Sequence, residues 1–303
     1  MQSNIIFLGT AGDVFVVGKQ LRGSGGVILQ MGEMQFHIDP GPGSLVRAVQ
    51  NGVNLRANTA IFATCNHINH SNDINAVINA MTYGGFDKRG ILVASNSVVN
   101  GEGSYLTEFH KKCLEKIIVL KAGQRIGVED IEILALPANH SDPDTIGLKF
   151  ITEDFTLTYS SDTSYSKEII KEYKGTDILI LNVVLPGKEK NESQLNSEDA
   201  IRIIKEINPK LTIITHFGLK MIKADPLYEA REIQKQTGCQ VICAKDGMVL
   251  SPKSYAAESH QKRLSSVLQK EKAEIEVRQE PEIPKEKHEE PKDHQEHLKE
   301  EEQ

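Results

Sequence analysis

The segment Thr64-Cys65-Asn66-His67-Ile68-Asn69-His70 decides the fold class of this chain. It follows the apolar run Thr59 to Ala63 and precedes a helical pattern from Asp73 to Met81, so we place it in a turn between a strand and a helix. Thiol, imidazole and amide groups are potential metal ligands, and a tight turn lets them converge on one point. The segment therefore predicts a metal site at the end of a strand.

Other ligand-type residues follow predicted strands further along the chain. His140 follows the run Ile131 to Ala138, Asp162 follows Thr156 to Tyr159, and His216 follows Leu211 to Ile214. Residues at the ends of successive strands gather on one edge of a sheet, where loops build a site on a rigid base. We therefore expect them to join the first segment in one site. His37 and His110 stand alone, and we interpret them as structural residues.

Strand-like and helical patterns alternate along the first 251 residues. Helical spacing covers Ser197 to Ile207, which opens with acids in its first turn, and Pro226 to Gln236. The other strand-like runs are Ile5 to Leu8, Gly26 to Met31, Met34 to Ile38, Ile146 to Ile151, Ile178 to Leu181 and Gln240 to Ala244. Early hairpins followed by alternating strands and helices predict a layered α/β arrangement, with sheet packed on sheet and helices outside.

In this order the motifs resemble the metallo-β-lactamase superfamily over nearly all of residues 1 to 251. The family pattern His-x-His-x-Asp-His is followed by a downstream His, a bridging Asp and a last His. Its counterparts here are Cys65, His67, Asn69, His70, His140, Asp162 and His216. The segments Phe7 to Gly12 and His37 to Gly43 also resemble the family. The resemblance implies an αββα four-layer sandwich with the metal edge between its two sheets.

The resemblance also implies two ligand sets. Metal one would be held by Cys65, His67 and His140, and metal two by Asn69, His70 and His216, with Asp162 joining both. Zinc is the expected metal, as one or two ions, with manganese or iron as alternatives. The implied activity is hydrolysis by a metal-bound hydroxide.

Two positions depart from the family pattern. Cys65 replaces an imidazole by a thiol, which ligates zinc well, although a small buried cysteine that ligates nothing is the alternative. Asn69 replaces a carboxylate by a neutral amide, which removes charge from metal two. Asp142 and Asp144 lie nearby as partial substitutes, but Asp-Pro-Asp is typical of a turn, and we favour the turn.

The motifs favour one branch of the superfamily and two classes of function. Ser160 to Thr163 and Thr215 to Gly218 resemble the phosphodiesterase and ribonuclease Z side. The short spans from His140 to Asp162 and from Asp162 to His216 leave no room for the insertions that ribonuclease Z enzymes use. We therefore expect a hydrolase of a small ester, lactone or phosphodiester at a modified dinuclear site. The alternative is a catalytically impaired protein of this fold that acts as a binding or scaffolding module.

Composition limits the partners and the setting of the chain. The net charge of −7 argues against a nucleic-acid partner, no apolar run is long enough to cross a membrane, and the N-terminus lacks the pattern of a signal peptide. The sparse cysteines indicate a cytoplasmic setting, and we interpret Cys239 and Cys243 as core residues.

We divide the chain into a domain of residues 1–251 and a charged tail of residues 252–303, which is predicted to be disordered or partly helical over Ser259 to Val277. The tail is a solvated spacer or, alternatively, an arm that binds a protein partner.

Overall fold

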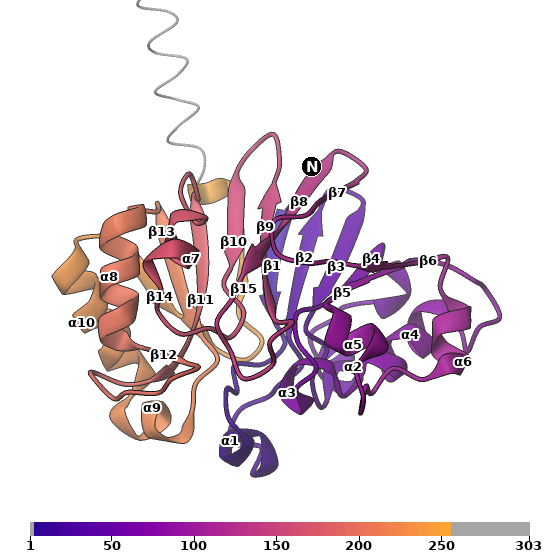
Figure 1. Cartoon of the computed structure of the whole chain (residues 1–303), viewed down its shortest axis with the longest axis horizontal. Helices are drawn as coiled ribbons and strands as arrows, with labels where there is room; N and C mark the ends of the chain where they lie inside the picture. The colour runs from indigo at the N-terminus through magenta and orange to yellow at the C-terminus, as the bar shows by residue number, and fades with distance from the viewer. Residues whose placement is uncertain (1–2, 256–303) are drawn as a thin grey trace, which may run out of the picture. The chain divides into compact units, whose positions relative to one another are not determined.

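Two β-sheets form the centre of the molecule (Figure 1). The computed structural model describes residues 3–255 of the chain, which lie in the compact unit Met1–Glu258. Tyr255 packs against the apolar cluster between the sheets. The predictions for the tail from residue 256 onward lie outside the described residues.

The first sheet has seven strands in the order β15-β1-β2-β3-β4-β5-β6. Their bounds are Val249–Leu250, Ser3–Phe7, Val27–Met31, Met34–Ile38, Ala60–Ala63, Ile91–Ala94 and Lys116–Val119. Strands β3 and β4 are parallel neighbours, with Ile38 beside Phe62. The residues that follow β3 and the turn that follows β4 therefore meet at the same edge of this sheet.

The second sheet has eight strands in the order β14-β13-β11-β10-β9-β8-β7, with β12 paired to β11. Their bounds are Val241–Cys243, Leu211–Thr215, Ile178–Leu185, Thr156–Tyr159, Ile146–Ile151, Ile131–Pro137 and Arg125–Val128, with β12 at Leu195–Asn196. Strands β10, β11 and β13 are parallel, and the hairpin β8–β9 turns at the edge where β10 ends. His140, Asp162 and His216 consequently leave the second sheet at one edge.

Helices cover the outer face of each sheet. On the first sheet and its loops lie α2 Ser44–Gln50, η1 Leu55–Ala57, α3 Ile68–Ser71, α4 Ile74–Thr82, α5 Asn96–Asn100 and α6 Glu108–Cys113. On the second lie α7 Lys167–Lys171, α8 Ser197–Ile207, α9 Leu219–Ala224 and α10 Pro226–Thr237, and α1 Val14–Gly18 packs against α9. A capping box of Asn196 and Asp199 fixes the start of α8, and Gly238, at φ 72°, ends α10.

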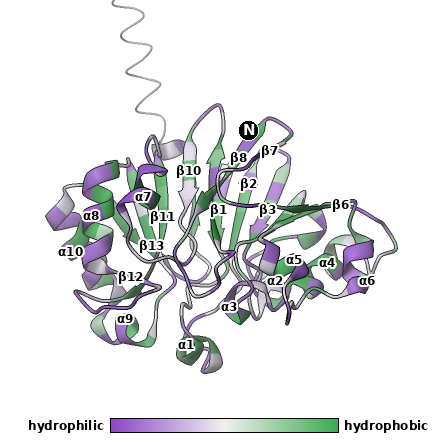
Figure 2. Ribbon diagram, viewed as in Figure 1, coloured by the Kyte–Doolittle hydropathy of each residue, from purple (hydrophilic) through white to green (hydrophobic). Residues whose placement is uncertain are grey.

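Apolar contacts hold the layers together and leave the polar groups at the sheet edge. Phe36, Phe62 and Phe150 meet between the sheets with ring centroids 5.4–6.0 Å apart. Separate apolar clusters join each sheet to its own helices, and the strands are mainly apolar while the outward helix faces are hydrophilic (Figure 2). The predicted αββα four-layer fold is confirmed. Among residues 3–255, none of the helices has the length and apolar character that crossing a membrane requires.

Candidate metal centre

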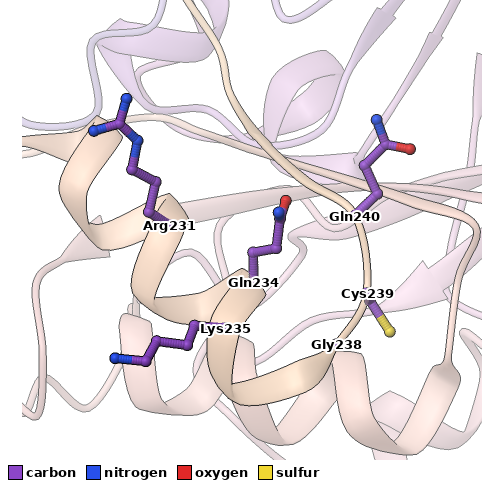
Figure 3. A pocket seen from close by; sticks show the side chains of 6 residues that line it. All are labelled: Arg231, Gln234, Lys235, Gly238, Cys239 and Gln240. Atoms are coloured by element: carbon purple, nitrogen blue, oxygen red, sulfur yellow. The ribbon is translucent and has the colours of Figure 1, made fainter.

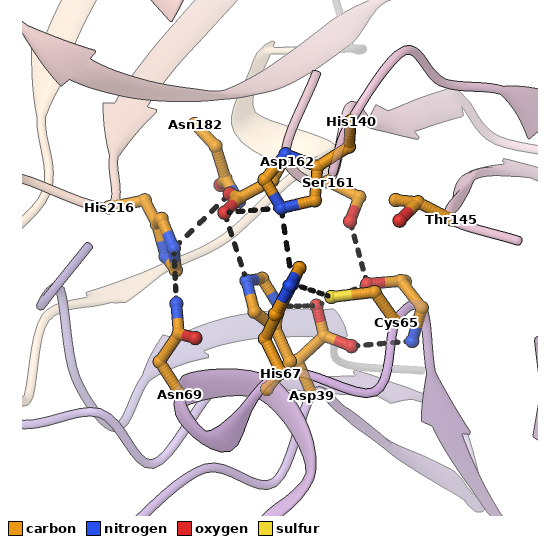
Figure 4. A network of polar contacts seen from close by, with 12 residues as sticks. Asp39, Cys65, His67, Asn69, His140, Thr145, Ser161, Asp162, Asn182 and His216 are labelled. Carbon is orange, nitrogen blue, oxygen red and sulfur yellow. Dashed lines mark hydrogen bonds and ion pairs between the residues drawn. The ribbon is translucent and has the colours of Figure 1, made fainter. Parts of the chain in front are cut away.

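All seven residues that the motifs predict as ligands lie together at the edge where strands of both sheets end (Figure 4). Six of them form two groups whose ligand atoms lie within 4.8 Å of one another: Cys65, His67 and His140 in one, and His70, Asp162 and His216 in the other. We call the first group the sulfur position and the second the oxygen position. The sets that the sequence predicts for metal one and metal two thus appear as two adjacent clusters.

The sulfur position combines two buried side chains with a more exposed one. The Sγ atom of Cys65 lies 3.4 Å from Nδ1 of His67, and Nε2 of His140 lies 3.1 Å from the same nitrogen. The side chains of Cys65 and His140 are buried, whereas His67 is partly exposed. Two imidazoles and a thiol that converge in this way are an ordinary zinc donor set.

The oxygen position is built around the carboxylate of Asp162. Its Oδ1 lies 3.2 Å from Nε2 of His216, and its Oδ2 lies 3.3 Å from Nε2 of His70. The same Oδ2 lies 3.7 Å from Nε2 of His140. Asp162 therefore stands between the two positions, as the bridging residue of the family pattern would.

Asn69 lies at the rim of the oxygen position. Its Nδ2 is 3.0 Å from Nε2 of His216. A half turn of the amide exchanges its nitrogen and oxygen, so Asn69 offers at most a neutral oxygen donor. Asn69 therefore lies at the metal position that the sequence predicts for it, but its side chain carries no negative charge.

Asp39, the residue after β3, fixes the orientation of His70. Its Oδ2 accepts hydrogen bonds from Nδ1 of His70 at 2.7 Å, from Oγ1 of Thr64 at 2.8 Å and from the hydroxyl of Tyr159 at 2.8 Å. A proton on Nδ1 leaves the lone pair of Nε2 free for a metal. This buried Nε2 has no hydrogen-bond partner in the described structure, which fits a metal ligand. The residues present thus fit the metal that the fold implies.

Contacts from the second sheet orient the other ligands. Nδ1 of His140 donates to the carbonyl of Ser193 at 2.8 Å, which leaves its Nε2 free. Nδ2 of Asn182 donates to Oδ1 of Asp162 at 2.8 Å, and Nε2 of Gln194 lies 3.5 Å from Oδ2. Strand β11, through Asn182, and the loop that follows it, through Ser193 and Gln194, therefore contact two of the candidate ligands.

The backbone of His216 is held by the opening loop of the chain. His216 adopts φ 65°, and a Cβ on Gly12 would lie 1.9 Å from its carbonyl oxygen. Phe217 donates its N–H to the carbonyl of Thr10 at 2.7 Å, and Gly12 donates to the carbonyl of Phe217 at 2.9 Å. Only glycine fits this close approach, which explains the place of Phe7 to Gly12 in the motif set.

The buried groups of the site shift one another's pKa values. Burial alone would raise the pKa of Asp162, but His216 and His70 hold it well below its usual range. Burial alone would lower the pKa of His70, but Cys65, Asp39 and Asp162 raise it well above its usual value. Burial raises the pKa of the Cys65 thiol to about 12. The acidic groups around His70 therefore favour a positive charge at this point, which a divalent cation would also supply.

Asp142 and Asp144 belong to the turn rather than to the metal groups. Oδ2 of Asp142 accepts from the N–H of Asn66 at 2.8 Å and from Oγ of Ser97 at 2.6 Å. Asp144 accepts from Nδ2 of Asn96 at 3.0 Å. Through Asn66, this turn anchors the loop that carries the ligands of the sulfur position.

The two other histidines of the described chain lie outside both groups. His37 is buried in β3, where its Nε2 donates to the carbonyl of Gly25 at 2.8 Å. Burial lowers its pKa to about 4. His110 lies on α6, where Oγ1 of Thr107 is 2.7 Å from its Nδ1. Their contacts are those of structural residues.

Cys243 and Cys239 differ in burial. Cys243 packs in the core of β14, as predicted, whereas Cys239 precedes that strand and is partly exposed. Cys239 lines a shallow hollow at the end of α10 (Figure 3) with Arg231, Gln234, Lys235, Gly238 and Gln240. This hollow contains no carboxylate or imidazole and is separate from the metal groups.

Sequence reasoning did not identify the residues that orient the ligands. Asp39 belongs to the quoted segment His37 to Gly43, so a strand-end signal for it existed. Asn182 also left a signal, because it is a polar residue that follows the apolar run Ile178 to Leu181. Ser193 acts through a backbone carbonyl, which every residue type possesses, and no sequence signal marks it.

Comparison with known proteins places this geometry in a family. A profile of the "Beta-lactamase superfamily domain" matches residues 35–217. "Uncharacterized protein MJ1374" of Methanocaldococcus jannaschii is 35% identical over 253 residues, which cover 82% of this chain and 94% of that protein.

Two solved structures share the fold at low sequence identity. The metallo-beta-lactamase fold protein YhfI from Bacillus subtilis superposes with a TM-score of 0.70 and 19% identity, covering 82% of this chain and 99% of its own. A diphosphatase from the PhnP family superposes with a TM-score of 0.63 and 18% identity, covering 82% of this chain and 98% of its own. At these identities the likeness shows the fold.

Proposed function

This chain belongs to the beta-lactamase superfamily, in its branch of metal-dependent hydrolases, and from that premise we propose that it hydrolyses a small ester, lactone or phosphodiester. The observation that carries the proposal is the position of Asp162. Its carboxylate faces His70 and His216 on one side and His140 on the other, so two ligand groups share one anion. This arrangement suits two neighbouring cations.

The residues of the site hold and orient these ligands. A divalent metal in either position supplies Lewis acidity to a scissile oxygen and lowers the pKa of water toward neutrality. Asp39 and the carbonyl of Ser193 accept hydrogen bonds from Nδ1 of His70 and of His140, so the Nε2 atoms face the metal positions, and Asn182 donates to Asp162. Zinc suits the thiol and imidazole donors, with manganese or iron as alternatives.

The proposed substrate is small and is not a nucleic acid. The net charge of −7 disfavours a polyanion, and the segments between His140, Asp162 and His216 form only short loops, strands and helices of the core fold. One solved structure of this fold is named a diphosphatase, so a phosphate-containing substrate suits the fold. A cytoplasmic location and a protein partner for the tail are further parts of the proposal. The four free cysteines support the location.

The proposal is tested on protein purified without chelator. We expect at least about one equivalent of divalent metal per chain and hydrolysis of a generic phosphodiester, aryl ester or lactone. His67→Ala should lower kcat/KM at least about 100-fold, the scale of one electrostatic contact to a transition state. His110→Ala, on α6 outside the groups, is the matched control and should retain parent activity. Less than about half an equivalent of metal, or equal activity of His67→Ala, would refute the proposal.

Asn69 favours a second candidate, a binding module that keeps the fold without catalysis. Its neutral amide gives the oxygen position no anion besides Asp162. The double variant Asn69→Asp with Cys65→His decides between the two. If it creates hydrolysis that the parent lacks, the binding module is supported; if the parent already hydrolyses, the module is excluded.

A further inference from the structure

The two metal positions differ in their donor atoms. The sulfur position offers one thiol sulfur and two imidazole nitrogens, and the oxygen position offers a carboxylate and two imidazole nitrogens, with a neutral amide at its rim. Thiolates prefer zinc and softer ions, whereas carboxylate and amide oxygens suit harder ions such as manganese. The same protein edge therefore presents one soft and one hard site.

The positions also differ in negative charge. A thiol that binds metal does so as thiolate, so Cys65 gives the sulfur position an anion of its own. Asp162 is shared, because its Oδ2 lies 3.3 Å from Nε2 of His70 and 3.7 Å from Nε2 of His140. Asn69 adds no charge to the oxygen position. Among the groups that would contact the ion directly, a first cation thus meets two anions at the sulfur position and one at the oxygen position, where Asp39 acts only through His70.

Orientation of the imidazoles does not offset this difference. Nδ1 of His140 donates to Ser193 at 2.8 Å, and Nδ1 of His70 donates to Asp39 at 2.7 Å, so one imidazole in each position is held with its Nε2 free. Access does not separate the positions, because the His140 side chain is 3% exposed and the His216 side chain 10%. Donor type and charge therefore carry the difference.

We propose that the two positions load in order and with different preferences. The sulfur position binds the first and softer divalent ion through the Cys65 thiolate, and the oxygen position binds a second, harder ion more weakly. This inference rests on the proposed function only in requiring that the chain binds metal; hydrolysis plays no part in it.

Titration of the metal-free full chain with Co²⁺ tests the order. Thiolate-to-cobalt charge transfer absorbs in the near ultraviolet, and we expect this absorption to rise with the first equivalent and to be complete there. Cys65→Ser should lack the absorption and bind the first equivalent at least about 10-fold more weakly, since changes even beyond the direct ligands cost 10–100-fold. Cys239→Ser, whose thiol lies in the separate hollow, should keep the parent absorption.

A second variant keeps the test decisive if Cys65→Ser fails to fold. Asn69→Asp alters a residue at the rim and adds a carboxylate to the oxygen position, so it should tighten the second equivalent and leave the first unchanged. The inference is overturned if the thiolate absorption grows with the second equivalent or is absent while cobalt binds. It is also overturned if Asn69→Asp tightens the first equivalent alone. A chain that binds no cobalt, zinc or manganese would overturn the proposed function as well.

Discussion

Two aspartates at strand ends, Asp39 after β3 and Asp162 after β10, show how neighbours decide the role of one residue type. Both are buried, and both lie at the edge that carries the ligands. The carboxylate of Asp39 is surrounded by hydrogen-bond donors from Thr64, His70 and Tyr159. Asp162 receives Asn182 but otherwise faces imidazole nitrogens that suit a metal. The hydrogen bonds of Asp39 therefore stabilise the site, whereas the carboxylate of Asp162 is available to a metal.

Asp162→Asn should have the largest effect on metal binding. The variant keeps the shape of the side chain but removes the one anion shared by both positions, so we expect affinity at both to fall at least about 100-fold, the upper end of what even residues beyond the direct ligands contribute. Metal per chain after dialysis against buffered zinc measures the change. Asp144→Asn, in the turn after His140, is the matched control and should bind as the parent does. Undiminished binding by Asp162→Asn would remove the distinction between the two aspartates.

Asp39→Asn should act mainly on stability. The amide replaces an acceptor by a donor that faces other donors, and we expect the free energy of unfolding to fall by about 3 kcal/mol or more, because each lost bond to a buried charged group costs about 1.5–3 kcal/mol. Metal affinity should fall about 10–100-fold through the lost support of His70. Tyr159→Phe removes one donor alone and should cost less than Asp39→Asn does. Urea unfolding measures the stability of both variants. If Asp39→Asn bound metal more weakly but were as stable as the parent, the stabilising role of Asp39 would be contradicted.

His37, also on β3, should make stability depend on pH without affecting the metal. Its pKa is about 4 in the folded protein against an ordinary value of 6.5, so the unfolded chain binds the extra proton between these values. Stability should therefore fall as pH drops from about 6.5 to 4, by up to about 3 kcal/mol from this group.

Urea unfolding at pH 7 and pH 4.5 of the parent and of His37→Leu measures the effect of that histidine. The variant should lose part of the pH dependence while binding the same amount of metal at pH 7. An unchanged pH dependence would show that His37 does not couple folding to protonation.

The elements with a strong local sequence pattern were predicted correctly. The predicted helix Ser197 to Ile207 coincides with α8, whose capping box is encoded within a few residues, and the predicted strands Ile146 to Ile151 and Thr156 to Tyr159 coincide with β9 and β10. The short helix α1 and the half-exposed strand β7 were not predicted. A helix of five residues is too short for a periodic pattern, and the exposed Arg125 and Gly127 interrupt the apolar pattern of β7. Neighbouring elements stabilise both segments.

At the candidate site, too, the residues within one segment were predicted and the contacts between distant segments were not. The turn Cys65 to His70 concentrates its ligands in one segment, so the sequence alone indicated them. The contacts that orient the ligands join Asp39 to His70, Asn182 to Asp162 and Ser193 to His140, across 31, 20 and 53 residues of chain. Such pairs leave little local pattern, because parallel strands bring their ends together only after the sheets have formed.

Residue types and their order along the chain were enough to predict the fold class, the ligand-type residues and the two departures at Cys65 and Asn69. Residue type and strand-end position carry that information, because side-chain chemistry and local propensity are properties of short segments. The tertiary structure decided that these residues form two adjacent groups and that Asp162 stands between them, while Asp39 is occupied by donors. Those facts depend on distances between side chains from both sheets, which packing of the apolar core sets and which no single segment specifies.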